Sequence, residues 1–280
     1  MQALVERSRG WARRVGVSRS EFYAVLFVVT FTNGVMPRVI ATVEGHGTLS
    51  GPLDGFGISA IVWAAAIAAI RMIVKMPAQP VARRDLLLGG GMLLLCLVPA
   101  GDAAWLALAV FGFALLFDSA QSAAARAAGT IAFGITIPML WGKFVARFAN
   151  VPLERLDALL TGWISGAGSS GNVIYFQGGN DNLMILWPCT SYANFSFALL
   201  LWIAITRSVR PRPAKNEWYW LLSLPLSVLV INTVRLTLMV QNRHMYETLH
   251  GPFGQELFGL LLLLSALTLT LLGVRRELLA

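Results

Sequence analysis

The stretch ELFGLLLLLSALTLTLLGV, residues 256–274, decides the class of fold, because its one charged residue, Glu256, stands at its start. A helix of this length is near the roughly 20 apolar residues that cross the hydrocarbon core of a bilayer. Seven further apolar stretches precede it, at about 22–40, 58–74, 86–101, 103–118, 131–147, 190–206 and 218–240. The sequence therefore predicts an all-α, multi-pass transmembrane helical bundle of about eight helices.

The composition agrees with a chain that is covered mostly by lipid. Of the 280 residues, 56% are hydrophobic and 13% are charged, whereas a soluble domain carries about 25% charged residues. The apolar stretches are continuous and lack the in-out alternation of barrel strands. We expect a single membrane-embedded domain over 1–280, with helices one to five in 1–147, an outer loop at 148–189, and helices six to eight in 190–280.

The basic residues predict how the chain is oriented. The net charge is +8, but the positive residues recur in short clusters between apolar stretches, as membrane topology requires, and we expect no nucleic-acid partner. Sixteen of the 22 fall on one side if the N-terminus is cytoplasmic: Arg7, Arg9, Arg13, Arg14, Arg19, Arg71, Lys75, Arg83, Arg84, Arg126, Arg207, Arg210, Arg212, Lys215, Arg275 and Arg276. The prediction is a cytoplasmic (inner) membrane protein with both termini inside.

The longest outer segment, 148–189, contains three recognisable pieces. Residues 151–160 are amphipathic and are expected along the membrane interface. Residues 172–177 and 184–189 lie between Gly-Gly and Pro breaks, and they predict two short extended pieces, compatible with a hairpin, over the outer face of the bundle.

The two cysteines lie in different settings. Cys96 stands in the middle of the third apolar stretch, where a thiol usually serves as a small buried hydrophobe. Cys189 stands at the junction of the outer loop and the sixth helix. A helix N-terminus stabilises a thiolate through the helix dipole and the open backbone N–H groups. Cys189 is therefore either a nucleophile or a structural interfacial residue.

Arg235 lies inside the seventh predicted helix. A charged residue within a span costs roughly 2.5 to 3.5 kcal/mol on insertion scales, so it is a functional candidate by default. Snorkelling to the outer surface is the alternative. Asn232 precedes Arg235 by three residues and shares its helical face, which favours a polar face directed into the bundle.

Three histidines fall in predicted outer loops, His46 in the first and His244 and His250 in the last. His250 is the better candidate for proton transfer because it lies in a Gly/Pro-defined turn before the final helix. Glu247 is available to orient or polarise either His244 or His250.

Cys189, Arg235 and His250 follow one another on helix six, helix seven and the entrance to helix eight. The charge-based topology places all three on the outer face without having used them. A thiolate, a proton carrier and a fixed cation form a set suited to acyl transfer: the thiolate attacks a carbonyl, the imidazole moves the proton, and the guanidinium stabilises the oxyanion or orients the substrate.

The second part of the chain resembles the exosortase/archaeosortase family. The resemblance rests on Asn172-Val173-Ile174, on Cys189 opening a helix, on Asn232-x-x-Arg235 and on His250-x-x-x-Gly254, and it covers about residues 170–274. The sequence departs from the family pattern after the cysteine, where Thr190-Ser191 stands in place of the common Ser-Gly.

The resemblance implies a membrane-embedded cysteine transpeptidase with Cys189, Arg235 and His250 as catalytic residues. Asn232, Glu247 and Gly254 would support or orient them. The implied partners are C-terminal sorting signals of exported proteins, each a short motif followed by a transmembrane helix and a basic tail, and an envelope acceptor that receives the new carboxyl end.

One other class of function stays open. In a transporter, or in a non-catalytic envelope or polysaccharide assembly factor, Arg235 and Asn232 would line the path of an anion, and Cys189 would have no chemical task. The chain has no His-Glu-x-x-His motif, no phosphate-binding Gly-Lys loop and no second metal-ligand cluster, so we expect neither a metal nor a cofactor.

Overall fold

The computed structural model describes residues 16–46, 55–117, 122–176, 181–215 and 217–278. Contacts within the chain concentrate in two compact units. The first comprises Met1–Leu140 with Ile203–Pro213, and the second comprises Trp141–Trp202 with Ala214–Ala280. The expectation of one membrane-embedded domain concerns the chain in its bilayer and stays a prediction. Arg7, Arg9, Arg13 and Arg14 lie outside the described residues.

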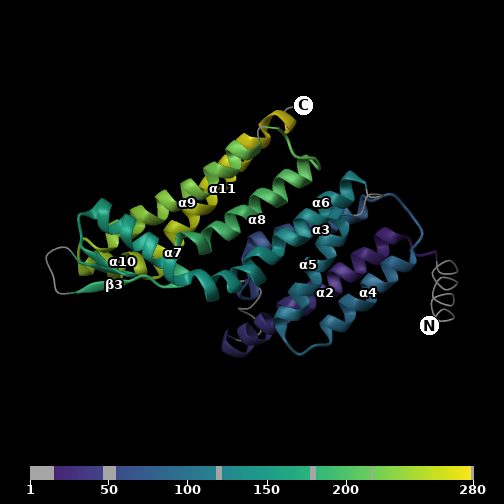
Figure 1. Cartoon of the computed structure of the whole chain (residues 1–280), viewed down its shortest axis with the longest axis horizontal. Helices are drawn as coiled ribbons and strands as arrows, with labels where there is room; N and C mark the ends of the chain where they lie inside the picture. Colours follow the sequence, from purple (N-terminus) through teal and green to yellow (C-terminus); the bar gives the residue numbers. More distant parts are fainter. Residues whose placement is uncertain (1–15, 47–54, 118–121, 177–180, 216, 279–280) are drawn as a thin grey trace. The chain divides into compact units, whose positions relative to one another are not determined.

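The first unit is a set of apolar helices (Figure 1). Its elements are α2 (Arg19–His46), a 3-10 turn (Gly55–Gly57), α3 (Ala60–Val74), α4 (Arg83–Cys96), α5 (Gly101–Phe117) and α6 (Ala123–Thr136). Helix α5 packs on α2, α4 and α6, and α6 also packs on α3. His46 was expected in a loop, but it is the last residue of α2.

Helices α4 and α5 follow one another after a short turn, which lies a few residues before the boundary expected from the apolar stretches 86–101 and 103–118. Gly101 and Asp102 open α5. An acidic residue in the first turn interacts favourably with the helix dipole, so Asp102 marks a helix start. The chain turns at residues 97–100, just before it.

Small residues allow α5 and α6 to approach closely. A Cβ added to Gly112 would lie 2.9 Å from the carbonyl oxygen of Gly129, and a Cβ added to Gly129 would lie 2.7 Å from that of Gly112. Neither position has room for a larger side chain. Close backbone approach at small residues is a common way for membrane helices to associate.

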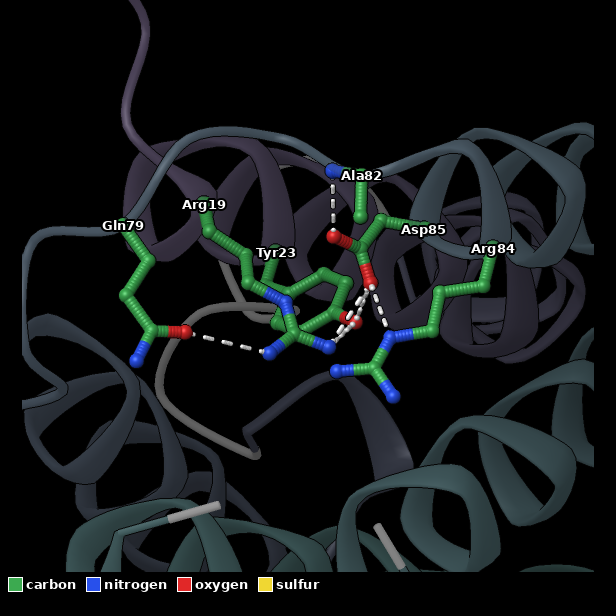
Figure 2. Close-up of polar contacts among 6 residues, drawn as sticks. All are labelled: Arg19, Tyr23, Gln79, Ala82, Arg84 and Asp85. Carbon is green, nitrogen blue, oxygen red and sulfur yellow. Dashed lines mark hydrogen bonds and ion pairs between the residues drawn. The ribbon is translucent and has the colours of Figure 1, made fainter. Parts of the chain in front are cut away.

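A buried ion pair joins the start of α2 to the start of α4 (Figure 2). Nη2 of Arg19 lies 2.7 Å from Oδ1 of Asp85, and the two side chains are 3% and 1% exposed. Tyr23 donates its hydroxyl to the same oxygen at 2.6 Å. The backbone N–H of Ala82 donates to Oδ2 at 2.8 Å, which caps α4. Such a pair is expensive to break from one side, because the remaining charge loses its partner.

The second unit contains helices and a small sheet (Figure 1). Its elements are α7 (Gly142–Ser165), β1 (Ser169–Ser170), β2 (Val173–Tyr175), β3 (Asn182–Met184), a 3-10 turn (Trp187–Cys189), the part of α8 (Ser191–Val209) up to Trp202, α9 (Glu217–Met239), α10 (Arg243–His250) and α11 (Pro252–Leu278). Helix α9 packs on α7, α10 and α11.

The amphipathic piece at 151–160 is helical, but it continues the preceding helix. The chain stays helical from Ala123 to Ser165, through a wide π turn at Ile137–Trp141. Pro138 lies in this turn and has no N–H for the regular ladder. At 1.5 Å per residue this segment measures about 65 Å along its path, roughly twice the thickness of the hydrocarbon core. Gly166 ends it with a left-handed φ of 70°.

The predicted all-α bundle with a small extended segment is confirmed. Within the part of the chain that the structure describes, five helical segments are long and apolar enough to cross a membrane: Arg19–Gly45, Ala123–Ser165, Ser191–Val209, Glu217–Met239 and Pro252–Arg275. Helices at Ala60–Val74 and Gly101–Phe117 are apolar but shorter. The count of eight spans and the orientation of the termini stay predictions.

The buried ion pair gives a direct test of the first unit. Asp85→Asn leaves the Arg19 guanidinium without a counter-charge, and we expect it to lower the free energy of unfolding by about 3–5 kcal/mol. Arg84→Gln is the control, since that side chain is 56% exposed and its Nε lies 3.9 Å from Asp85. The measurement is thermal unfolding of the purified protein in detergent. Equal stability of the two variants would contradict this assignment.

Candidate functional site

The two predicted extended pieces pair as strands. The sheet has the order β1-β2-β3, and β2 and β3 are antiparallel with Ile174 opposite Leu183. Strand β3 starts two residues earlier than the predicted piece at 184–189, and that piece continues into the 3-10 turn. Gln177, at the end of the other piece, lies outside the described residues.

The sheet rests on the helices of its own unit. Ile174 and Ile185 are fully buried. They belong to a hydrophobic cluster with side chains of α7, α9, α10 and α11, namely Ala158, Leu236, Met239, Val240, Leu249 and Phe258. Asn172 fixes the entrance to β2, because its Nδ2 donates to the carbonyl oxygen of Ile185 at 2.9 Å and to Oε2 of Glu154 at 3.2 Å. The motif Asn172-Val173-Ile174 therefore has a structural task in this chain.

Cys189 ends the 3-10 turn that links β3 to α8, two residues before that helix begins. Its N–H donates to the carbonyl oxygen of Leu186 at 2.8 Å, and its side chain is partly exposed. Thr190 is fully buried. Its hydroxyl donates to Trp187 O at 2.8 Å and accepts from the N–H of Ala193 at 3.3 Å. Thr190 thus caps α8 and holds the turn at once.

A network of hydrogen bonds fixes this turn from two helices. Asp157 on α7 accepts from the N–H and from the hydroxyl of Ser191, both at 2.8 Å. Asn232 on α9 donates to the carbonyl oxygen of Cys189 at 3.0 Å and to Oγ of Ser191 at 3.2 Å. Asp157 and Asn232 are 3% and 2% exposed. The backbone of Cys189 is therefore tied to α7 through Ser191 and to α9 directly.

The sequence did not identify Asp157 or Ser191 as site residues. A signal was present, since Glu154 and Asp157 are three residues apart and so lie on one face of a helix. Both prove to be buried. The N–H at the start of α8, expected to be open near Cys189, is taken by Asp157.

Arg235 contacts α10 and α11. Its Nη2 donates to the carbonyl oxygen of Leu249 at 3.2 Å, and its guanidinium lies 5.9 Å from the ring centre of Phe258. Its Nε is buried and has no hydrogen-bond partner among the described residues. This buried N–H donor of Arg235 is therefore unsatisfied within the described part of the chain.

His250 is the last residue of α10, a short helix in a segment that was expected to be a loop. The signal for this helix is Asn242, whose side chain caps it by accepting from the N–H of Met245 at 2.9 Å. The His250 ring is exposed and stacks on Tyr246, with ring centres 5.0 Å apart and planes 12° apart. The carboxylate of Glu247 accepts from Arg243 at 2.9 Å rather than from either histidine.

Gly254 allows the first turn of α11 to press against the end of α10. A Cβ added there would overlap the backbone of Leu249. The carbonyl of Leu249 is the group that Arg235 binds, and His250 follows it in the chain. Gly254 therefore influences the positions of Arg235 and His250 through the backbone of Leu249.

One cavity of about 320 Å³ brings the three candidates together. Its lining residues are Asn182, Leu183, Met184, Ile185, Leu186, Cys189, Arg235, Leu236, Met239, Tyr246 and His250. Asn232, Glu247 and Gly254 are not among them. Cys96 belongs to the first unit, where its Sγ lies 3.9 Å from Oγ1 of Thr30. The cavity joins a thiol, a guanidinium and an imidazole, the groups that acyl transfer through a cysteine requires.

Among the described residues, no group of three His, Cys, Asp or Glu side chains is placed to hold a metal ion. No protein-family model matches the sequence, and the comparisons with curated proteins and with solved structures give no match.

Gly254 offers a test of how the site is supported. Gly254→Ala forces the Leu249 backbone to move, and we expect a loss of about 1–3 kcal/mol, the usual cost of overpacking. Gly259→Ala is the matched control on the same helix, because a Cβ there meets nothing within 4 Å. Thermal unfolding in detergent compares the two variants. A Gly254→Ala variant as stable as Gly259→Ala would refute the close approach of α10 and α11.

Proposed function

We propose that this chain is a membrane-embedded cysteine peptidase and transpeptidase. It would cleave the C-terminal sorting signals of exported proteins and transfer the new carboxyl end to an envelope acceptor. The observation that carries the proposal is the shared cavity of Cys189, Arg235 and His250. The order and spacing of Asn172, Cys189, Asn232, Arg235, His250 and Gly254, which resemble the exosortase/archaeosortase pattern, give the substrate class.

In this mechanism Cys189 attacks the scissile carbonyl as a thiolate. The thiol proton passes to His250, which later gives it to the leaving amine as the C–N bond breaks. The acceptor's nucleophile then attacks the resulting thioester and releases Cys189. The guanidinium of Arg235, which lines the cavity, would stabilise the oxyanion that forms at each attack. Asn232 and Asp157 would keep the Cys189 turn in place through the backbone and Ser191.

The proposal places the site at the outer face of the cytoplasmic membrane, with both termini inside. The basic clusters support this orientation. Arg207 and Arg210, at the end of α8 and just beyond it, would then lie on the cytoplasmic side. Cys189, which precedes the start of the same helix, would lie at the opposite end of that span. A sorting signal that crosses the membrane from outside to inside would present its outer end to this thiol.

Cysteine substitution tests the proposal. Cys189→Ala and Cys189→Ser should fold but leave a co-expressed sorting-signal substrate uncleaved. Alanine has no nucleophile, and the serine hydroxyl has no base adapted to it. Cys96→Ala should retain most activity, because that thiol only fills space. The readout is the mass of the substrate protein. Full cleavage by Cys189→Ala at normal protein levels would refute the peptidase and favour a transporter or a non-catalytic assembly factor.

Arg235→Lys separates two roles of the guanidinium. Lysine keeps the charge but cannot reproduce the planar set of donors, one of which binds Leu249 O while the rest of the guanidinium lines the cavity. We expect this variant to be nearly inactive, with a loss of about 100-fold or more, as for removal of an oxyanion donor. His250→Ala should be severely impaired and His244→Ala much less so. If Arg235→Lys processes substrate as rapidly as the parent, Arg235 contributes only its positive charge.

A further inference from the structure

Strand β3 is an edge of the small sheet. It pairs with β2 on one side, and no other strand of the described residues pairs with its other side. An edge strand carries a row of N–H and C=O groups available for pairing with another chain. An exposed edge strand can pair with another chain and aggregate, so proteins either cover such an edge or use it for binding.

The register fixes which groups of this edge are open. The N–H of Phe176 donates to Asp181 O, and the N–H of Ile185 donates to Asn172 O. In an antiparallel pair the direction of the backbone groups alternates from residue to residue. Residues 181, 183 and 185 therefore face β2, and residues 182, 184 and 186 face away. Among the described residues, no hydrogen bond engages the outward backbone groups of Asn182 or Met184.

This open edge lies on the wall of the cavity that contains Cys189. All five residues from Asn182 to Leu186 line it, together with Arg235 and His250. At roughly 3.3 Å per residue the edge measures about 13 Å. It then runs directly into the turn of Cys189, because Leu186 O accepts the Cys189 N–H.

We propose that the edge of β3 binds the peptide substrate as an added extended strand. Backbone groups of the peptide pair with Asn182 and Met184, and this pairing delivers a peptide carbonyl to Cys189. Such strand addition takes its affinity from main-chain hydrogen bonds and its selectivity from alternate side chains. The assignment rests on the proposed peptidase function and names the conformation that its substrate adopts. The bound peptide would also pair with the backbone groups that the edge leaves open.

The side chains beside this edge define what the bound peptide meets. Met184 and Leu186 are 55% and 54% exposed, whereas Leu183 and Ile185 are buried beneath the strand. Alternate residues of an added strand would therefore lie beside Met184 and Leu186 and contact apolar surface. The recognition motif is expected to carry small or apolar residues at alternate positions.

The test measures how fast Cys189 is alkylated in the full chain carrying Cys96→Ala, purified in detergent. The probes are acetyl-alanyl and acetyl-tetraalanyl chloromethyl ketones. In both, the Cys189 sulfur displaces chloride, a C–S bond forms and a C–Cl bond breaks. If the peptide adds to β3, the longer probe should react about tenfold faster, because it gains two or more backbone hydrogen bonds. Equal rates for the two probes would overturn the proposal.

Two changes show whether the gain comes from the strand edge. Met184→Pro removes one outward donor and leaves the β2 ladder intact, so it should abolish most of the gain. Ser169→Pro is the matched control, because Gly168 O accepts from Tyr175 and Ser169 therefore faces outward on the other edge strand. N-methylation along the tetraalanyl probe should reduce the rate at alternate positions. If the tetraalanyl probe keeps its rate advantage in Met184→Pro and also after N-methylation, the assignment is overturned.

Failure of this proposal is distinct from failure of the proposed function. Iodoacetamide, which has no peptide, reports the reactivity of Cys189 alone, and each probe rate is divided by the iodoacetamide rate of the same variant. Substrate cleavage by Cys189→Ala would refute the peptidase, whereas a reactive Cys189 without any effect of probe length would refute only the strand.

Discussion

The arrangement of the site depends on a single network, in which Asp157 and Asn232 hold the turn that carries Cys189. Polar groups in a low-dielectric setting must find partners, because an unpaired one costs several kcal/mol. Here the partners are supplied from two helices, since α7 contributes the carboxylate that binds Ser191 and α9 contributes the amide that binds Cys189 O. Each bond satisfies a buried group and also fixes a position. The requirement for satisfied hydrogen bonds thus becomes a requirement for one geometry around the thiol.

The same constraint explains the sequence around the cysteine. Thr190 stands where the resembling family commonly has serine, and Ser191 where it has glycine. In this chain Thr190 is buried and caps α8, and Ser191 is the contact of Asp157. A glycine at 191 would lose the hydroxyl that joins Asp157 to Asn232. Ser191 therefore supplies two hydrogen bonds to a buried acid on another helix.

Much of this architecture could be predicted from the sequence, for specific reasons. Apolar length predicted α9 and α11, and Gly and Pro breaks predicted the hairpin before Cys189. The order of Cys189, Arg235 and His250, together with the basic residues, predicted that they share the outer face, and this stays a prediction; the structure places all three around one cavity. The partners of these residues could not be predicted. Whether Asp157 or Asp85 is exposed or buried depends on which helices pack against it, and that information is tertiary. Helix α10 was missed because eight residues between two spans give little periodicity. The continuation of the predicted helix at 131–147 through residues 151–160 was hidden by Pro152, which lies inside α7.

The central claim is that Cys189 carries the acyl group of the substrate during the reaction. The most direct measurement is mass spectrometry of the Cys189-containing peptide from cells that process a co-expressed substrate, after rapid acid quenching. The account predicts a thioester at Cys189 with the mass of the substrate's new C-terminal segment, removed by neutral hydroxylamine. A substrate that is processed while Cys189 stays a free thiol at every time point would contradict it.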